Sequence, residues 1–304
     1  MNAPTHLLAA TDLSSSSLHA VDRGFQLASQ TGARYTILHA LGLDALAQLR
    51  ELLGGDTTDV SRKITDDARD ALMRILGDPS RNCGVVAELQ LEPGTPASAV
   101  PRYAEATDAD LILVGAHGKG FLQRSMLGST ASRLLRKSQC PVLVVKEPCR
   151  SRYRRVLVAV DFSPESERSI RLARELAAGA ELDLLHVFEV PFEVKLRFAG
   201  VSQDIIDHYR IEARDQALQQ IKRMAKGAGL ASADYTAQVM QGDATRQILA
   251  HEESADCDLI VMGKHGTHVT EALLLGSVTN HVLAQSRSDV LVVVDARKAI
   301  GTGA

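Results

Sequence analysis

The chain has 304 residues and a formal net charge of -3, so it lacks the basic field on which sequence-independent binding to nucleic acid depends. No apolar run approaches the ~18 residues of a membrane span, and the N-terminus has neither the basic nor the apolar segment of a secretory signal. The cysteines form no CxxC pair and show no zinc-ligand spacing. We therefore expect a cytoplasmic protein with no membrane span and no nucleic-acid partner.

The chain repeats itself with an offset of 147 to 149 residues. The segment DADLILVGAHG at 108–118 matches DCDLIVMGKHG at 256–266, and LLAATDLS at 7–14 matches VLVAVDFS at 156–163. A period of this length indicates duplication of one whole domain. We predict a first domain over 1–147 and a second over 153–297, joined by a short polar linker at 148–152.

Short apolar runs alternate with helical patterns in the first half. Strands are predicted where Val, Ile and Leu cluster, at 6–11, 34–40, 85–91, 110–115 and 141–146. Two helical patterns lie between them and end near Gly32 and Gly77. Their apolar positions recur every three or four residues: Leu18, Val21, Phe25 and Ala28, then Ile64, Ala68, Leu72 and Ile75.

The second half follows the same plan. Its first helix is predicted to start at Ser163, which has the character of an N-cap, and Pro164 and Glu165 suit the first helical turn. Alternating β and α units imply a parallel sheet with right-handed crossovers. We therefore expect five parallel strands in each half, with helices on both faces.

A glycine-rich pattern follows the fourth strand of each half. It is a GxxG followed, nine residues later, by Gly-Ser: Gly115, Gly118, Gly128 and Ser129, then Gly263, Gly266, Gly276 and Ser277. Glycine lets the backbone approach a ligand and aim N–H groups at an anion, and the N-terminus of the last helix favours phosphate. The alternative is that the glycines only make tight turns and the serines are plain N-caps.

An aspartate ends the first strand of each half, Asp12 and Asp161. Ligands of doubly wound sheets bind beyond the carboxyl ends of the strands, at the point where the strand order reverses. A carboxylate there can hydrogen-bond ribose or help to hold a metal on phosphates. The alternative is that each aspartate caps the helix that follows.

These features together resemble the universal stress protein family in its tandem form. The glycine pattern is similar to that family's ATP-binding signature, and the strand-ending aspartates and the matched strands TILHAL (36–41) and DLLHVF (183–188) add to a resemblance that covers nearly the whole chain. It implies two Rossmann-like domains of the adenine nucleotide alpha hydrolase-like kind, each with strand order 3-2-1-4-5. It also implies bound ATP, AMP or ADP, Mg or Mn, and a role in the stress response.

The resemblance further implies where the nucleotide would lie. Ala10 and Asp12 would line the ribose-phosphate side, the backbone of Ala40 would meet adenine, and Asp12 and Asp161 would hold the metal through the phosphates. The full set of implied binding residues is Ala10, Asp12, Ala40, Gly115, Gly118, Gly128, Ser129 and Thr130, then Val160, Asp161, Val187, Gly263, Gly266, Gly276, Ser277 and Val278.

The resemblance also implies how the chain assembles. The fifth strands, at 141–146 and 289–294, would pair and join the two halves as an intramolecular pseudo-dimer. A further homodimer and the identity of a protein partner stay open.

The two glycine loops differ in charge. The first contains Lys119 and Arg124, whereas the second contains Glu271 and no lysine or arginine over 267–275. Lys264 is expected to compensate in part, because cations near ATP offset its negative charge. We therefore predict tighter ATP binding in the first half.

The sequence shows no Walker motif, no legible Ser–His–Asp arrangement and no base for activating water. No catalytic residue is assigned, and we expect a nucleotide-dependent regulator with at most slow hydrolysis or autophosphorylation. Two alternatives stay open: a slow ATPase or nucleotidyl-transferring enzyme on the same fold, and a nucleotide-free scaffold. His39 and His186 are interpreted as core histidines bonded to backbone.

Overall fold

The computed structural model describes residues 3–42, 58–118, 127–189, 199, 201–266 and 275–294. The first half contains β1 (His6–Thr11), α1 (Ser15–Thr31), β2 (Arg34–Ala40), α3 (Thr58–Leu76), α4 (Pro79–Asn82), β3 (Glu88–Glu92), α5 (Pro96–Ala106), β4 (Leu111–Gly115), α6 (Ser129–Lys137) and β5 (Val142–Val145). The second half contains β6 (Arg155–Ala159), α7 (Pro164–Leu176), β7 (Glu181–Phe188), α9 (Gln203–Gly227), β8 (Tyr235–Gln241), α10 (Ala244–Ala255), β9 (Leu259–Gly263), α11 (Ser277–Gln285) and β10 (Asp289–Val293).

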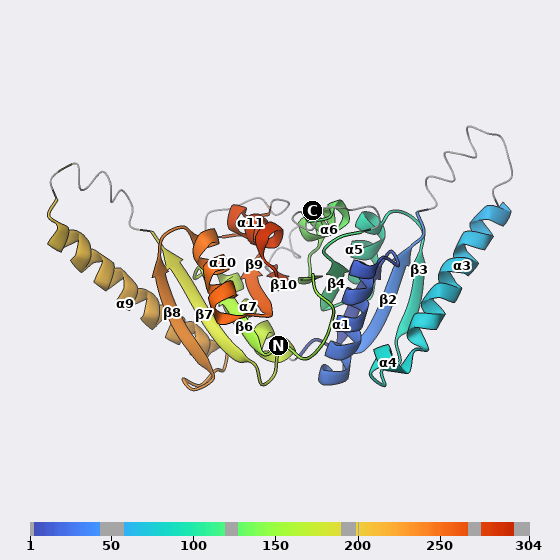
Figure 1. Cartoon of the computed structure of the whole chain (residues 1–304), viewed down its shortest axis with the longest axis horizontal. Helices are drawn as coiled ribbons and strands as arrows, with labels where there is room; N and C mark the ends of the chain where they lie inside the picture. The colour runs from blue at the N-terminus through green and yellow to red at the C-terminus, as the bar shows by residue number, and fades with distance from the viewer. Residues whose placement is uncertain are drawn as a thin grey trace, which may run out of the picture.

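The ten strands of the described residues form one sheet with the order β3-β2-β1-β4-β5-β10-β9-β6-β7-β8. Each half therefore has the predicted order 3-2-1-4-5, and the strands within each half are parallel. The two halves meet where β5 pairs antiparallel with β10, with Leu143 opposite Leu291. The predicted contact between the fifth strands is thus present within the chain, and α3 and α9 lie at the two outer ends of the molecule (Figure 1).

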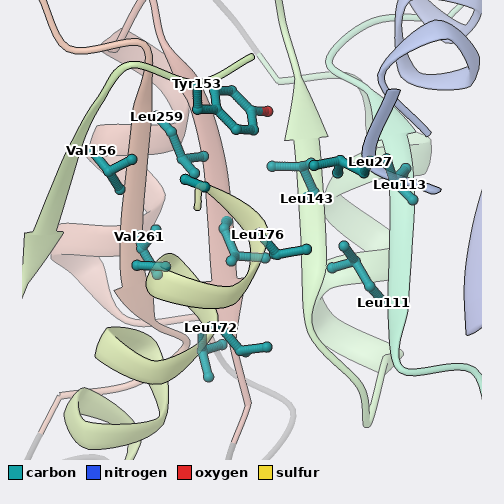
Figure 2. Packing of buried hydrophobic residues seen from close by; sticks show 14 of the residues in the cluster. Leu27, Leu111, Leu113, Leu143, Tyr153, Val156, Leu172, Leu176, Leu259 and Val261 are labelled. Atoms are coloured by element: carbon teal, nitrogen blue, oxygen red, sulfur yellow. The ribbon is translucent and has the colours of Figure 1, made fainter. Parts of the chain in front are cut away.

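The central strands are buried on both faces, as their continuous apolar runs predict. One core cluster lies under α1, α3, α7 and α9, and a second lies under α5, α6, α10 and α11. Figure 2 shows the first cluster crossing the seam between the halves, with Leu143 of β5 on one side and Leu176 of α7 on the other. The halves therefore share a continuous core across the β5–β10 seam.

The helix starts and stops agree with the local sequence. Ser14 caps α1 by accepting a hydrogen bond from the Ser17 N–H, and Gly32 ends the helix in the left-handed region at φ 71°. Ser163 is the N-cap of α7 and Pro164 is its first residue, as predicted. Within the described residues, no helix is both long and apolar enough to cross a bilayer.

Two features of the first half differ from expectation. The third strand was predicted over 85–91 but begins at Glu88, because Cys83 and Gly84 adopt positive φ and the turn leaves Val86 94% exposed. Ile64, predicted on the buried face of α3, is exposed, whereas Leu72 of the same face is fully buried. The amino-terminal part of α3 therefore contributes little to the core.

Candidate functional site

The strand-ending aspartates organise the turn between the first strand and the first helix of each half. Asp12 Oδ1 accepts a hydrogen bond from the Ser14 N–H at 3.0 Å. Asp161 Oδ1 accepts from the Ser163 N–H at 3.0 Å and from Ser166 Oγ at 2.8 Å. The N-caps themselves are the serines, so the alternative that the aspartates are N-caps is wrong.

The residue after each aspartate adopts a conformation that bulky side chains avoid. Leu13 has φ 64° and Phe162 has φ 66°, in the left-handed region that costs a non-glycine residue of order 1–3 kcal/mol. The same outlier at equivalent positions of the repeat shows that both halves need this sharp turn. The turn brings the start of the first helix back beside the end of the fourth strand.

The glycine loops pack against these turns. A Cβ at Gly115 would lie 2.5 Å from the Ser16 carbonyl oxygen, so only glycine permits this approach of β4 to α1. A Cβ at Gly118 would lie 3.0 Å from Asp12 Oδ2, and one at Gly266 would lie 3.4 Å from Asp161 Oδ2. In both halves the second glycine of the loop therefore faces the strand-ending carboxylate.

The last helix of each half starts at the same place. Gly128 and Gly276 are the N-caps of α6 and α11, and their own N–H groups donate to the carbonyls of Ala116 (2.8 Å) and Lys264 (3.0 Å). Ser129 and Ser277 are the first helical residues and are exposed. The alternative that the serines are N-caps is therefore wrong, and their hydroxyls stand at the helix N-terminus with the first free N–H groups.

A cavity lies at this point in each half, with a volume of about 170 Å³ in the first and about 310 Å³ in the second. Sequence reasoning singled out eight residues for each half, and each cavity wall includes all eight of its half. They are Ala10, Asp12, Ala40, Gly115, Gly118, Gly128, Ser129 and Thr130 in the first, and Val160, Asp161, Val187, Gly263, Gly266, Gly276, Ser277 and Val278 in the second.

Several further wall residues were missed by the sequence reasoning. In the first half the wall includes Leu38 of β2 and Pro96 and Val100 of α5, and in the second it includes Ala244 and Ile248 of α10. A signal was available, because the turn after the third strand also opens on the carboxyl edge of the sheet. The second cavity also includes Met262 and is therefore lined by larger apolar groups on this side.

His39 and His186 brace the same edge of the sheet. Their Nδ1–H groups donate to the carbonyls of Thr11 and Val160, both at 2.8 Å. The predicted backbone hydrogen bonds are therefore confirmed, but both residues are half-buried rather than in the core. His186 also stacks on Phe162 with ring centroids 4.1 Å apart, and burial lowers its pKa.

The expected role of Lys264 is wrong. Its side chain is buried, and its Nζ donates to the Arg136 carbonyl at 2.8 Å, at the end of α6 in the other half. It is absent from the described wall of the second cavity, because the seam between the halves offers it carbonyl acceptors. Lys119, Arg124 and Glu271 lie outside the described residues, so the predicted difference in affinity stays a prediction.

The fold and the paired cavities define a tandem α/β protein with two Rossmann-like domains. The model of the universal stress protein family matches residues 4–146 and again 152–294, so the chain belongs to the universal stress protein family.

Relatives of known sequence and structure agree. The chain is 29% identical over 271 residues to universal stress protein Rv2005c of Mycobacterium tuberculosis, covering 84% of this chain and 86% of the relative. It is 30% identical over 138 residues to universal stress protein MJ0531 of Methanocaldococcus jannaschii, covering 45% of this chain and 79% of the relative. Its fold is similar to a universal stress protein structure from Archaeoglobus fulgidus, with a TM-score of 0.67, 20% identity and coverage of 96% and 98% of the two chains.

Proposed function

We propose that this stress-response protein binds an adenine nucleotide in each of its two cavities, with ATP as the leading candidate. The observation that carries the proposal is that three features suited to a phosphate with its metal ion converge on one cavity in both halves. These are the glycine loop, the N-terminus of the last helix with its Ser129 or Ser277, and the aspartate that ends the first strand.

The wall suggests how the nucleotide would be oriented. The helix N-terminus and the glycine loop would take the phosphates, and the half-buried ends of β2 and β7, at Ala40 and Val187, would meet the base. A Mg or Mn ion suits the arrangement, because such ions are commonly held by one carboxylate together with phosphate oxygens. Asp12 and Asp161 would supply that carboxylate, since each is the one acidic side chain in the described wall of its cavity.

We propose binding and regulation rather than rapid turnover. The described wall of neither cavity includes a lysine or arginine that would stabilise a transferring phosphoryl group. His117 and His265 are the wall residues best suited to proton transfer, and the other acid–base group in each described wall is the strand-ending aspartate, which is assigned to the metal here. Any hydrolysis would therefore be slow. The bound nucleotide would act as a regulatory ligand, and a partner protein would recognise the nucleotide-bound form.

The test begins with the protein purified without added nucleotide. Denaturation and chromatography would identify released nucleotide, and calorimetric titration with Mg-ATP would count the sites. We expect two sites per chain in total. Gly118→Val fills the first loop and Gly266→Val fills the second, and each should remove one site and leave the other. Ala178→Val, at an exposed position of the 177–180 turn, is the matched control and should bind like the parent.

Two results would contradict the proposed nucleotide sites. Folded protein that releases no nucleotide and binds no Mg-ATP would overturn the proposal and favour the nucleotide-free scaffold. Retention of both sites in the Gly118→Val, Gly266→Val double variant would place the nucleotide elsewhere.

A further inference from the structure

A cluster of three different donor groups lies in the second half, away from both cavity walls. Asp183 is the third residue of β7, His251 lies in the carboxyl-terminal half of α10, and Cys257 is among the residues that lead into β9. One ligand atom of each lies within 4.8 Å of those of the other two, and His251 Nε2 is 3.0 Å from Asp183 Oδ2. The side chains of His251 and Asp183 are only 6% and 14% exposed, and Cys257 is buried.

The donor set is one that a divalent transition metal prefers. Imidazole nitrogen, carboxylate oxygen and thiolate sulfur are the three protein ligands of zinc, at bond lengths of about 2.0–2.3 Å. Tetrahedral bonds of that length place donors roughly 3.3–3.8 Å apart, so the cluster needs to contract only slightly. One carboxylate, one thiolate and a neutral imidazole also balance a charge of about +2, which a buried site requires.

The backbone around the cluster is held firmly. The Cys257 N–H donates to the Glu252 carbonyl at 3.0 Å, and the Cys257 carbonyl accepts from Ser288 Oγ at 2.7 Å. Asp256 turns the chain with φ 51°, which brings Cys257 next to α10. Since the backbone of Cys257 is fixed on both sides, the thiol is positioned before any ion arrives.

The charged neighbours leave the cluster available. Arg155 is the cation that acts on the charge of Cys257. Its guanidinium is already bound, because it pairs with Glu181 at 2.7 Å and donates to the Ala255 carbonyl. The Glu252 carboxylate is occupied elsewhere, because its Oε1 accepts from the Ser288 hydroxyl and from two backbone N–H groups. The cluster is partly exposed where Asp183 lies. An ion can enter from this side, and a water molecule can bind there as the fourth ligand.

The first half provides a natural comparison. The equivalent positions are Thr36, Tyr103 and Ala109, and His6 Nε2 makes a simple hydrogen bond to Thr36 Oγ1 at 3.0 Å there. The cluster is therefore a feature of the second copy alone. It also differs from the proposed nucleotide site, since neighbouring Leu185 and Ile248 line the cavity wall whereas Asp183 and His251 do not.

We propose that Asp183, His251 and Cys257 form a zinc-type metal site in the second half, with water completing a tetrahedral set. A free thiol is protonated at neutral pH, so the incoming cation displaces one proton as the sulfur becomes a ligand. The ion would tie the start of β9 to β7 and α10, directly behind the wall of the second cavity.

The experiment is a cobalt titration of the full-length protein after treatment with a chelator. We expect one Co²⁺ per chain, with the near-ultraviolet charge-transfer band of a thiolate ligand and the visible absorption of a tetrahedral site. Zn²⁺ should displace the cobalt and raise the melting temperature. Cys257→Ser should lose the charge-transfer band, while Cys140→Ser, which removes a half-buried thiol of the first half, should keep it.

A second variant keeps the test decisive if Cys257→Ser folds poorly. Asp183→Asn retains the size of the side chain and should weaken zinc binding at least ~10-fold, with an unchanged circular dichroism spectrum. Absence of a charge-transfer band in the folded parent protein would overturn the proposal. A band that persists in Cys257→Ser, or zinc affinity unchanged in Asp183→Asn, would overturn it as well.

Discussion

At the scale of single residues, the equivalent glycines Gly115 and Gly263 differ in how closely their surroundings pack against them. The space for a Cβ at Gly115 is closed by backbone, since Ser16 O would lie at 2.5 Å and Ser17 N at 2.7 Å. The equivalent space at Gly263 meets His265 O at 3.1 Å and the Glu165 side chain at 3.4 Å. Backbone of a packed helix moves less easily than a loop carbonyl or a side chain, so the two positions differ in tolerance.

We predict that Gly115→Ala lowers the melting temperature more than Gly263→Ala does. Overpacking against α1 should cost roughly 2–3 kcal/mol at Gly115, whereas local adjustment should keep the cost at Gly263 to about 1 kcal/mol or less. Thermal unfolding of both variants beside the parent protein measures the difference. Equal losses, or a larger loss for Gly263→Ala, would contradict the close approach of β4 to α1.

Individual residues also show what the sequence can and cannot predict. The glycines, serines and aspartates of the wall were found because they form local signals repeated in two copies, whereas other wall positions such as Ala40 and Val187 came from the family resemblance. Lys264 was misassigned because its direction depends on α6 of the other half, which no local pattern contains. The positive φ of Leu13 and Phe162 was also missed, since bulky residues disfavour it and only the surrounding packing enforces it.

At the scale of elements, two lysines, buried Lys264 and half-buried Lys146, cap helices across the seam. Lys146, just after β5, donates from Nζ to the carbonyls of Leu283 (2.8 Å) and Ser286 (2.7 Å) at the end of α11. Lys264, just after β9, does the same for the end of α6. A cation at a helix C-terminus satisfies free carbonyls and interacts favourably with the helix dipole. Each half thus stabilises the last helix of the other.

The Lys146 contact predicts a particular pH dependence. Burial lowers the pKa of Lys146 from 10.5 to about 8, so between these values the unfolded chain binds more protons than the folded chain. The free energy of unfolding should therefore rise with pH across this window, by up to about 3 kcal/mol relative to a variant without the lysine. Urea unfolding of the parent protein and Lys146→Met, at several pH values from 7 to about 10.5, measures this difference.

Lys222 provides the control for that comparison, because it is exposed on α9. The parent protein and Lys222→Met should differ by the same amount at every pH. A difference between parent and Lys146→Met that stays flat, or that shrinks as the pH rises, would show that Lys146 is not desolvated at the seam.

At the scale of the whole molecule, the backbone pairing at the seam between the halves is symmetric, but the buried charged side chains there are not. The strand pairing places Leu143 opposite Leu291, as in a symmetric dimer. The buried ionic groups do not repeat: Asp289 accepts from Tyr153 Oη at 2.6 Å and lies 3.4 Å from Arg23 Nε. The Arg23 guanidinium also lies over the Tyr153 ring, 4.1 Å from its centroid. The first half therefore supplies the cation of this pair, Arg23, and the second half supplies the acid, Asp289.

The repeat makes this arrangement specific. The position equivalent to Asp289 is Pro141 in the first half, and the position equivalent to Arg23 is Leu172 in the second. Two first halves paired through β5 would bury Arg23 twice with no acid, and two second halves would bury Asp289 twice with no cation. An uncompensated buried charge costs about 3–5 kcal/mol, so either symmetric pairing is strongly disfavoured.

The halves produced as separate chains, 1–148 and 149–304, should therefore prefer each other to themselves. We expect a one-to-one complex on mixing, seen by sedimentation or native mass spectrometry, with each half alone largely monomeric. Asp289→Asn in the second half should weaken the mixed complex, because the Arg23 charge would lose its partner. Stable homodimers of both separate halves, as tight as the mixed complex, would show that the backbone pairing of β5 and β10 sets the assembly and that the buried charges do not.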